Sequence, residues 1–194
     1  MLLGMTGSGG HRSNALQRAG WSLSHLAGGV GGGFVLGAAS WLAGVPAREV
    51  APEWVLGFLV VSIGAVSVMI DLDVLAVDRS NRQVDARLRG SIGTAASYAV
   101  YGVEFGLGWR TLRPSAMFYT LSAVLAFAVS APAVAVVAGI AFGLGRTFIL
   151  FPGSYVATRL SGMLTRDTRS RAWWRLAGAF GSVAIVVSGI GDLV

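Results

Sequence analysis

The side chains that could carry chemistry in this chain are few. Its 194 residues include no Cys, two His and nine Asp or Glu. The absence of Cys excludes disulfides, thiolate metal sites and thiol redox chemistry. No His, Asp and Glu set has the spacing of a metal site, and no Ser stands at a readable spacing from a His or Lys base. We therefore expect no catalytic residue, no metal and no cofactor, and we do not expect an enzyme.

Glu104 is the one carboxylate well inside an apolar segment that is long enough to cross a membrane. Ionisable groups in such segments are costly, rare and often functional. We expect Arg146 to be its partner, because both residues would lie in the last two turns of helices that run parallel. Two interpretations stay open: a proton-coupling or ion-pathway role, and a buried ion pair that fixes the helix register.

A short sequence echo brings two more arginines into the same argument. The residues Phe-Gly-Leu-Gly occur at 105–108 and again at 142–145, and Arg110, Arg113 and Arg146 follow the two copies. If the copies form a structural repeat, these arginines would converge at one mouth of a helix bundle and hold an anion or a lipid phosphate. The alternative is three separate arginines that extend to lipid headgroups.

Gly29, Gly33 and Gly37 follow one another at spacings of four, the small-xxx-small pattern of close helix contacts. The pattern predicts packing within the chain, or else a dimer interface or a substrate path between helices. The glycine-rich run around them follows no strand and has no Lys-Ser or Lys-Thr pair, so it is not a phosphate loop.

Composition indicates what surrounds these residues. The chain is 54% hydrophobic and 12% charged, with a mean hydropathy of +0.68, whereas a soluble domain carries about a quarter charged residues. Lipid is therefore the expected solvent. All fifteen basic residues are Arg and the net charge is +6, but the arginines are scattered between apolar segments, and we expect no nucleic-acid binding.

The apolar segments predict an all-α, polytopic transmembrane bundle of about six spans. A polar N-terminal segment, 1–20, would precede a single membrane domain, 21–194. The spans are expected at about 21–45, 54–70, 91–108, 115–129, 133–150 and 172–190. All five prolines fall in the expected connections, as helix geometry favours. The fourth span is short and could be a tilted or re-entrant arm.

Several smaller features admit two interpretations each. The first span could be a signal peptide, but it is long for one, and we interpret it as retained. His25 is expected to be an interfacial hydrogen-bonding residue rather than a metal ligand. Asp71, Asp73 and Asp78 could bind a cation, although a solvated helix end is the preferred interpretation. Six spans would place nine arginines on one face and six on the other, which favours termini outside the cell.

The segment 102–119, with its Phe-Gly-Leu-Gly-Trp core, resembles the Gly-rich span of the CcdA/DsbD-type membrane family, and also resembles uncharacterised actinobacterial multi-pass proteins. The first resemblance implies a six-span fold built from two related halves, in proteins that pass reducing equivalents across the membrane. Where that family has Thr-Pro-Cys, this chain has Arg-Thr-Leu-Arg-Pro at 110–114. Thiol electron transfer therefore does not carry over.

These observations predict a multi-pass protein of the plasma membrane, a bacterial inner membrane by its composition, that transports a small solute or ion. The alternative is a non-transporting accessory or scaffold subunit of a membrane complex. The expected partners are the lipid bilayer and either other membrane subunits or a second copy of the chain.

Overall fold

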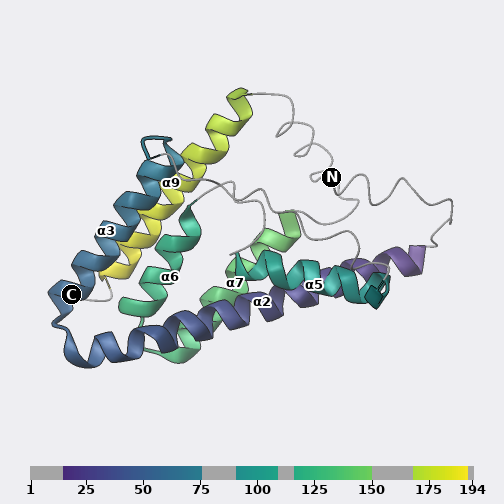
Figure 1. Cartoon of the computed structure of the whole chain (residues 1–194), viewed down its shortest axis with the longest axis horizontal. Helices are drawn as coiled ribbons and strands as arrows, with labels where there is room; N and C mark the ends of the chain where they lie inside the picture. Colours follow the sequence, from purple (N-terminus) through teal and green to yellow (C-terminus); the bar gives the residue numbers. More distant parts are fainter. Residues whose placement is uncertain (1–14, 76–90, 109–115, 150–167, 192–194) are drawn as a thin grey trace.

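The computed structural model describes residues 15–75, 91–108, 116–149 and 168–191, and every regular element within these ranges is an α-helix (Figure 1). The all-α class is therefore confirmed. The helices are α2 (Ala15–Val50), α3 (Glu53–Asp71), α5 (Thr94–Leu107), α6 (Met117–Phe127), α7 (Pro132–Ile149) and α9 (Thr168–Gly191). Each of the six segments expected from the sequence overlaps one of these helices.

Two of the described helices are long and apolar enough to cross a membrane, namely α2 over Ala19–Val50 and α3 over Glu53–Asp71. By contrast, α6 has 11 residues, which at 1.5 Å per residue gives about 16 Å. The hydrocarbon core of a bilayer is about 30 Å thick. Thus α6 alone is too short to be the full fourth span.

The helices form two groups that share α2. In Figure 1, α5 and α7 lie along one part of α2, and α3, α6 and α9 lie side by side near its C-terminal end. The buried core lies where the groups meet, between α2, α3, α6 and α7. Its buried members are Leu36, Val60, Leu121, Val124, Leu125, Ala128, Val129 and Ala135.

Close contacts give the helix directions around α2. On α5, Ala99 faces Gly28 and Leu107 faces Gly32, so α5 runs parallel to α2. On α7 the order is reversed: Thr147 faces Gly29, whereas Ala135 faces Gly37. The expectation that the third and fifth predicted spans run parallel is therefore wrong, because α7 is antiparallel to both α2 and α5.

The short turn between α6 and α7 reverses the chain again, so α6 is antiparallel to α7 and advances along α2 in the same sense as α5, although it is steeply inclined to α5 (Figure 1). The α9 helix also runs with α6 and against α3 (Figure 1). At the lower left of Figure 1, the C-terminal ends of α2, α6 and α9 therefore meet the N-terminal ends of α3 and α7. Six alternating spans would instead require α6 to run opposite to α5.

Pro46 lies inside α2, which continues to Val50, so the expectation that every proline falls in a connection is wrong at this position. A proline inside a helix removes one N–H and leaves a carbonyl one turn earlier without its helical donor. Near the end of a helix this disturbance is small. Pro52 precedes α3 and Pro132 is the first residue of α7, two positions that suit proline; Pro114 and Pro152 lie outside the described residues.

The turn between α6 and α7 is fixed to the end of α2 by two side chains. The Arg48 guanidinium donates hydrogen bonds to the carbonyls of Ala126 and Trp41, the latter over 3.0 Å. It also lies 5.0 Å from the centroid of the Trp41 ring, and Trp41 Nε1 donates to the carbonyl of Ser130 over 3.1 Å. The bond to Ala126 satisfies a carbonyl that the end of α6 leaves without a helical partner.

Candidate functional site

The three glycines singled out in the sequence all face α7 of the same chain. A Cβ placed on Gly33 would lie 2.9 Å from the Gly139 carbonyl carbon and from Ile140 Cα. A Cβ on Gly37 would lie 2.9 Å from Val136 Cα, and one on Gly29 would meet the side chain of Thr147. The backbones of α2 and α7 are therefore in direct contact along this ridge, as small residues allow.

A second glycine ridge on α2 faces α5. A Cβ on Gly28 would lie 2.9 Å from the Val103 amide nitrogen, and one on Gly32 would lie 2.9 Å from the Leu107 amide nitrogen. From the other side, a Cβ on Gly102 would lie 2.9 Å from the Gly29 amide nitrogen. One glycine-rich stretch of α2 is thus in close backbone contact with both α5 and α7.

Both copies of the repeated Phe-Gly-Leu-Gly motif contact α2 at this glycine-rich stretch. The first Gly in each copy, Gly106 on α5 and Gly143 on α7, contacts the backbone of Gly29 and Gly33. Added Cβ atoms would lie 2.9 Å from the Gly33 amide nitrogen in the first case and 3.0 Å from Gly33 Cα in the second. Both copies therefore meet α2 at the same level, although their helices run in opposite directions.

Arg146 lies where α5 ends and α6 begins. A Cβ on Gly108, the left-handed residue that caps α5 with φ of 70°, would lie 3.0 Å from Arg146 Nη1 and 2.7 Å from the ring of Phe118 on α6. The Arg146 guanidinium also lies 5.5 Å from the centroid of the Phe142 ring. We call this place the α5–α6 junction, defined by Gly108, Phe118 and Arg146.

Glu104 lies one turn before this junction and is half-buried; its carbonyl accepts a hydrogen bond from the Gly108 amide over 3.3 Å. The pairing of its carboxylate with Arg146 stays a prediction. Arg110 and Arg113 lie outside the described residues, so the convergence of three arginines also stays a prediction.

His25 is fully buried rather than interfacial, and it points between α2 and α5. Its Nδ1 lies 3.3 Å from the carbonyl oxygen of Tyr98, and its ring meets the ring of Phe105 edge-on at 5.8 Å. Its Nε2 is buried without a hydrogen-bond partner among the described residues. Trp21 stacks on Tyr98 beside it, with 5.9 Å between ring centroids. The sequence contains no local signal for this aromatic surrounding, because its members come from two helices.

Asp71 corrects another expectation, since it is fully buried and does not lie at a solvated helix end. One carboxylate oxygen accepts a hydrogen bond from the Ala116 amide over 2.7 Å. Ala116 is the residue that precedes α6. A carboxylate at the N-terminal end of a helix satisfies a free N–H and interacts favourably with the helix dipole. Asp71 is thus a tertiary cap for α6, supplied by the end of α3.

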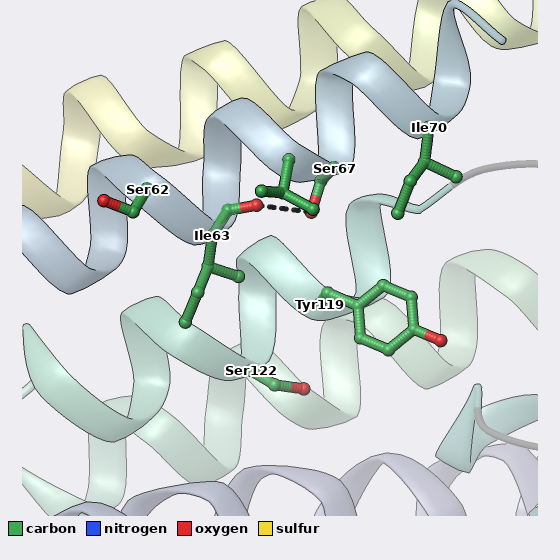
Figure 2. A pocket seen from close by; sticks show the side chains of 7 residues that line it. Ser62, Ile63, Ser67, Ile70, Tyr119 and Ser122 are labelled. Atoms are coloured by element: carbon green, nitrogen blue, oxygen red, sulfur yellow. Dashed lines mark hydrogen bonds between the residues drawn. The ribbon is translucent and has the colours of Figure 1, made fainter. Parts of the chain in front are cut away.

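A groove that the sequence analysis missed lies between α3 and α6, with a volume of about 480 Å³ (Figure 2). Its walls are mostly apolar, with a few hydroxyl groups among them. It is lined by Ser62, Ile63, Val66, Ser67, Ile70, Tyr119 and Ser122. Spacings of three and four along α3 place its residues on one face of that helix, and this is the one signal in the sequence that could have suggested the groove.

In the described ranges, no group of three or more His, Asp and Glu residues is placed to hold a metal ion. A scan against protein-family models finds no match, and searches of curated proteins and of solved structures find none either. The resemblance to six-span redox proteins therefore rests on the residues quoted for it alone.

Proposed function

We propose that the chain is a multi-pass protein of the plasma membrane. The support is the apolar surface of its long helices, where large side chains are half or more exposed. Examples are Phe34 at 50%, Leu42 at 61% and Phe58 at 67%. In water such a surface would be an aggregation hazard, whereas in lipid it is the expected outer face.

In this proposal the chain crosses the membrane five times. The helices α2, α3, α7 and α9 each make one crossing, and α5 and α6 together make the third. With 14 and 11 residues, α5 and α6 have a combined length of about 37 Å. Since the two helices advance along α2 in the same sense, the chain has no need to return between them.

The arginines support five crossings. The N-terminal ends of α2, α5 and α9 and the C-terminal ends of α3 and α7 would share one side, which we call the arginine-rich face. Connectivity assigns eleven of the fifteen arginines to it: Arg12, Arg18, Arg79, Arg82, Arg87, Arg89, Arg159, Arg166, Arg169, Arg171 and Arg175. Arg146 lies at the α5–α6 junction, and Arg110 and Arg113 belong to the connection between α5 and α6. Only Arg48 falls on the opposite side. Six crossings divide the same residues nine to six, so five crossings give much the stronger positive-inside bias. The arginine-rich face is then cytoplasmic and the C-terminus is outside.

Single cysteines distinguish the two arrangements, because the chain has no Cys of its own. With five crossings, cysteines at positions 80 and 170 should label with an impermeant maleimide from the cytoplasmic side, and a cysteine at position 130 should label from outside. With six crossings, positions 80 and 130 would share a side and position 170 would lie opposite. That second pattern would reject the five-crossing arrangement.

Within this membrane protein we propose that the α5–α6 junction handles a small solute or ion. The observation that carries the proposal is the interruption of one crossing at Gly108 beside the guanidinium of Arg146. Interrupted helices are the usual way in which transporters expose backbone groups to a substrate. The cationic side chain makes an anion the better fit.

Flux through proteoliposomes tests this function. With chloride and inorganic phosphate as probes, Arg146→Gln should lower the flux by about tenfold or more, because a hydrogen bond to a charged group contributes roughly 1.5–3 kcal/mol. Arg146→Lys should keep part of the flux, and Arg12→Gln, outside the described helices, should keep all of it. Flux in the unsubstituted protein that equals that of empty liposomes for both anions would reject the proposal.

Water access at the junction gives an independent measurement. A cysteine at Glu104 should react with an impermeant thiol reagent, whereas one at Ala65, on the exposed face of α3, should be protected by lipid. The alternative, a scaffold subunit, would need a glycine ridge that is free to pack against partner helices. In the structure Gly33 faces α7.

A further inference from the structure

The repeated motif is longer than Phe-Gly-Leu-Gly, and its two copies run in opposite directions beside α2 (Figure 1). The pattern Gly-x-x-Phe-Gly-Leu-Gly occurs at 102–108, where α5 ends, and again at 139–145, within α7. In both copies the first two glycines contact the backbone of α2. The two segments are therefore an inverted pair that shares one packing partner.

The last glycine of the motif has a different conformation in the two copies. Gly108 has a left-handed φ of 70° and ends α5. Its amide donates to the carbonyls of Glu104 and Phe105 over 3.3 and 3.2 Å, as at many helix ends that close with a left-handed glycine. Gly145 instead lies inside α7, which continues to Ile149. The same short sequence thus ends one helix and continues through another.

Neither packing nor backbone conformation requires glycine at position 145 in this structure. A Cβ there would meet nothing within 4 Å. Its φ is also not positive, since the positive-φ glycines of the described ranges are Gly93 and Gly108. Glycine is less favourable than alanine inside a helix, and its particular advantage is the left-handed conformation. A second state in which residue 145 is left-handed would account for the glycine.

The turn of α7 around Gly145 contains a second feature that weakens a helix. The buried hydroxyl of Thr147 donates to the carbonyls of Gly143 and Leu144, over 2.8 and 3.0 Å. Such bonds compete with the backbone hydrogen bonds of a helix and often bend it. The contact of Gly143 with α2 lies before Gly145, so a break at Gly145 keeps that contact and gives up the one between Thr147 and Gly29.

We propose that α7 has a second conformation in which it ends at Gly145, as α5 ends at Gly108, and that this break withdraws Arg146 from the α5–α6 junction. Arg146 directly follows Gly145, so a left-handed residue there redirects the chain and carries the guanidinium away from Gly108. This switch rests on the proposed handling of an anion at the junction, and it supplies the release step. The site has its cation while α7 is continuous and loses it when α7 breaks. Alternation between two states around inverted repeats is common in transporters.

Distances between two nitroxide labels test the switch in the full chain, which has no Cys of its own. Labels at Leu42 on α2, which is 61% exposed, and at position 148, beyond Gly145, should give two distances in bilayers. Gly145→Ala should lower one of the two populations by about tenfold, because a Cβ disfavours the left-handed conformation and alanine favours the helix. Gly145→Asn should keep both distances, since asparagine adopts the left-handed conformation more readily.

Two controls locate the effect. Labels at Leu42 and Val137, which precedes Gly145 on α7, should give one distance in every variant. Gly31→Ala, at another position where a Cβ would meet nothing within 4 Å, should leave both distances of the 42–148 pair unchanged. A single distance for the 42–148 pair in the chain without further substitution would overturn the proposal, and so would two populations that Gly145→Ala does not change.

Anion flux separates failure of the switch from failure of transport. Gly145→Ala should lower the flux of chloride and inorganic phosphate by about tenfold, because it disfavours the releasing conformation, whereas Gly31→Ala should keep it. If Gly145→Ala removes one of two distances but the unsubstituted protein shows no flux above that of empty liposomes, the switch stands and transport is rejected. Flux in a protein with a single distance would keep transport and reject the switch.

Discussion

Replacing Gly33 with alanine is expected to destabilise the protein by about 3 kcal/mol, at the upper end of the cost of overpacking a core. The new methyl group would lie 2.9 Å from the Gly139 carbonyl carbon and from Ile140 Cα. Both atoms belong to the backbone of α7, so no side-chain rotation can relieve the contact. The two helices would have to separate, and the other backbone contacts along the ridge would lengthen with them.

Gly31→Ala is the matched control, because it is on the same helix and a Cβ there would meet nothing within 4 Å. Both substitutions gain the same helix propensity, up to about 1 kcal/mol relative to glycine. The difference between the two variants therefore measures packing alone. Reversible unfolding in detergent micelles gives both values. Equal stability of the two variants would show that α2 and α7 are not in backbone contact.

The glycines show how far the sequence determines this site. A spacing of four places Gly29, Gly33 and Gly37 on one face of a helix, and small residues at that spacing indicate a close helix neighbour. The identity of the neighbour is a tertiary property, and so is its direction. The second ridge, Gly28 and Gly32, could have indicated that α2 has two close neighbours, since it lies about 100° around the helix from the first.

The directions of the helices could not be predicted from the sequence either, and the reason is different. Counting apolar segments assumes that each segment crosses the membrane once and that neighbours alternate. The chain does reverse between α2 and α3, but the short α6 advances along α2 in the same sense as α5 (Figure 1). The all-α class survives this error, because it depends on local apolar patterns. The span count depends instead on where the chain turns, and six spans stay a prediction.

Asp71→Ala is expected to destabilise the protein by about 2–3 kcal/mol, through the loss of the cap on α6 and the burial of an N–H without a partner. The carboxylate is fully buried and lies 2.7 Å from the Ala116 amide nitrogen. Asp71→Asn keeps a side-chain oxygen in the same place and should cost about 1 kcal/mol, the value of a single neutral hydrogen bond. The sequence around Asp71 does not reveal this bond, because the two partners are 45 residues apart.

Asp73→Asn is the control, two residues farther along and exposed. Asp73 has a φ of 59°, which asparagine adopts as readily as aspartate, so the substitution should change stability by less than about 0.5 kcal/mol. Unfolding of the three variants in micelles, followed by amide exchange over residues 116–119, would locate the loss at the start of α6. If Asp71→Ala and Asp73→Asn are equally mild, the Asp71 carboxylate does not cap α6, and the end of α3 would have to be fixed to α6 by apolar contacts alone.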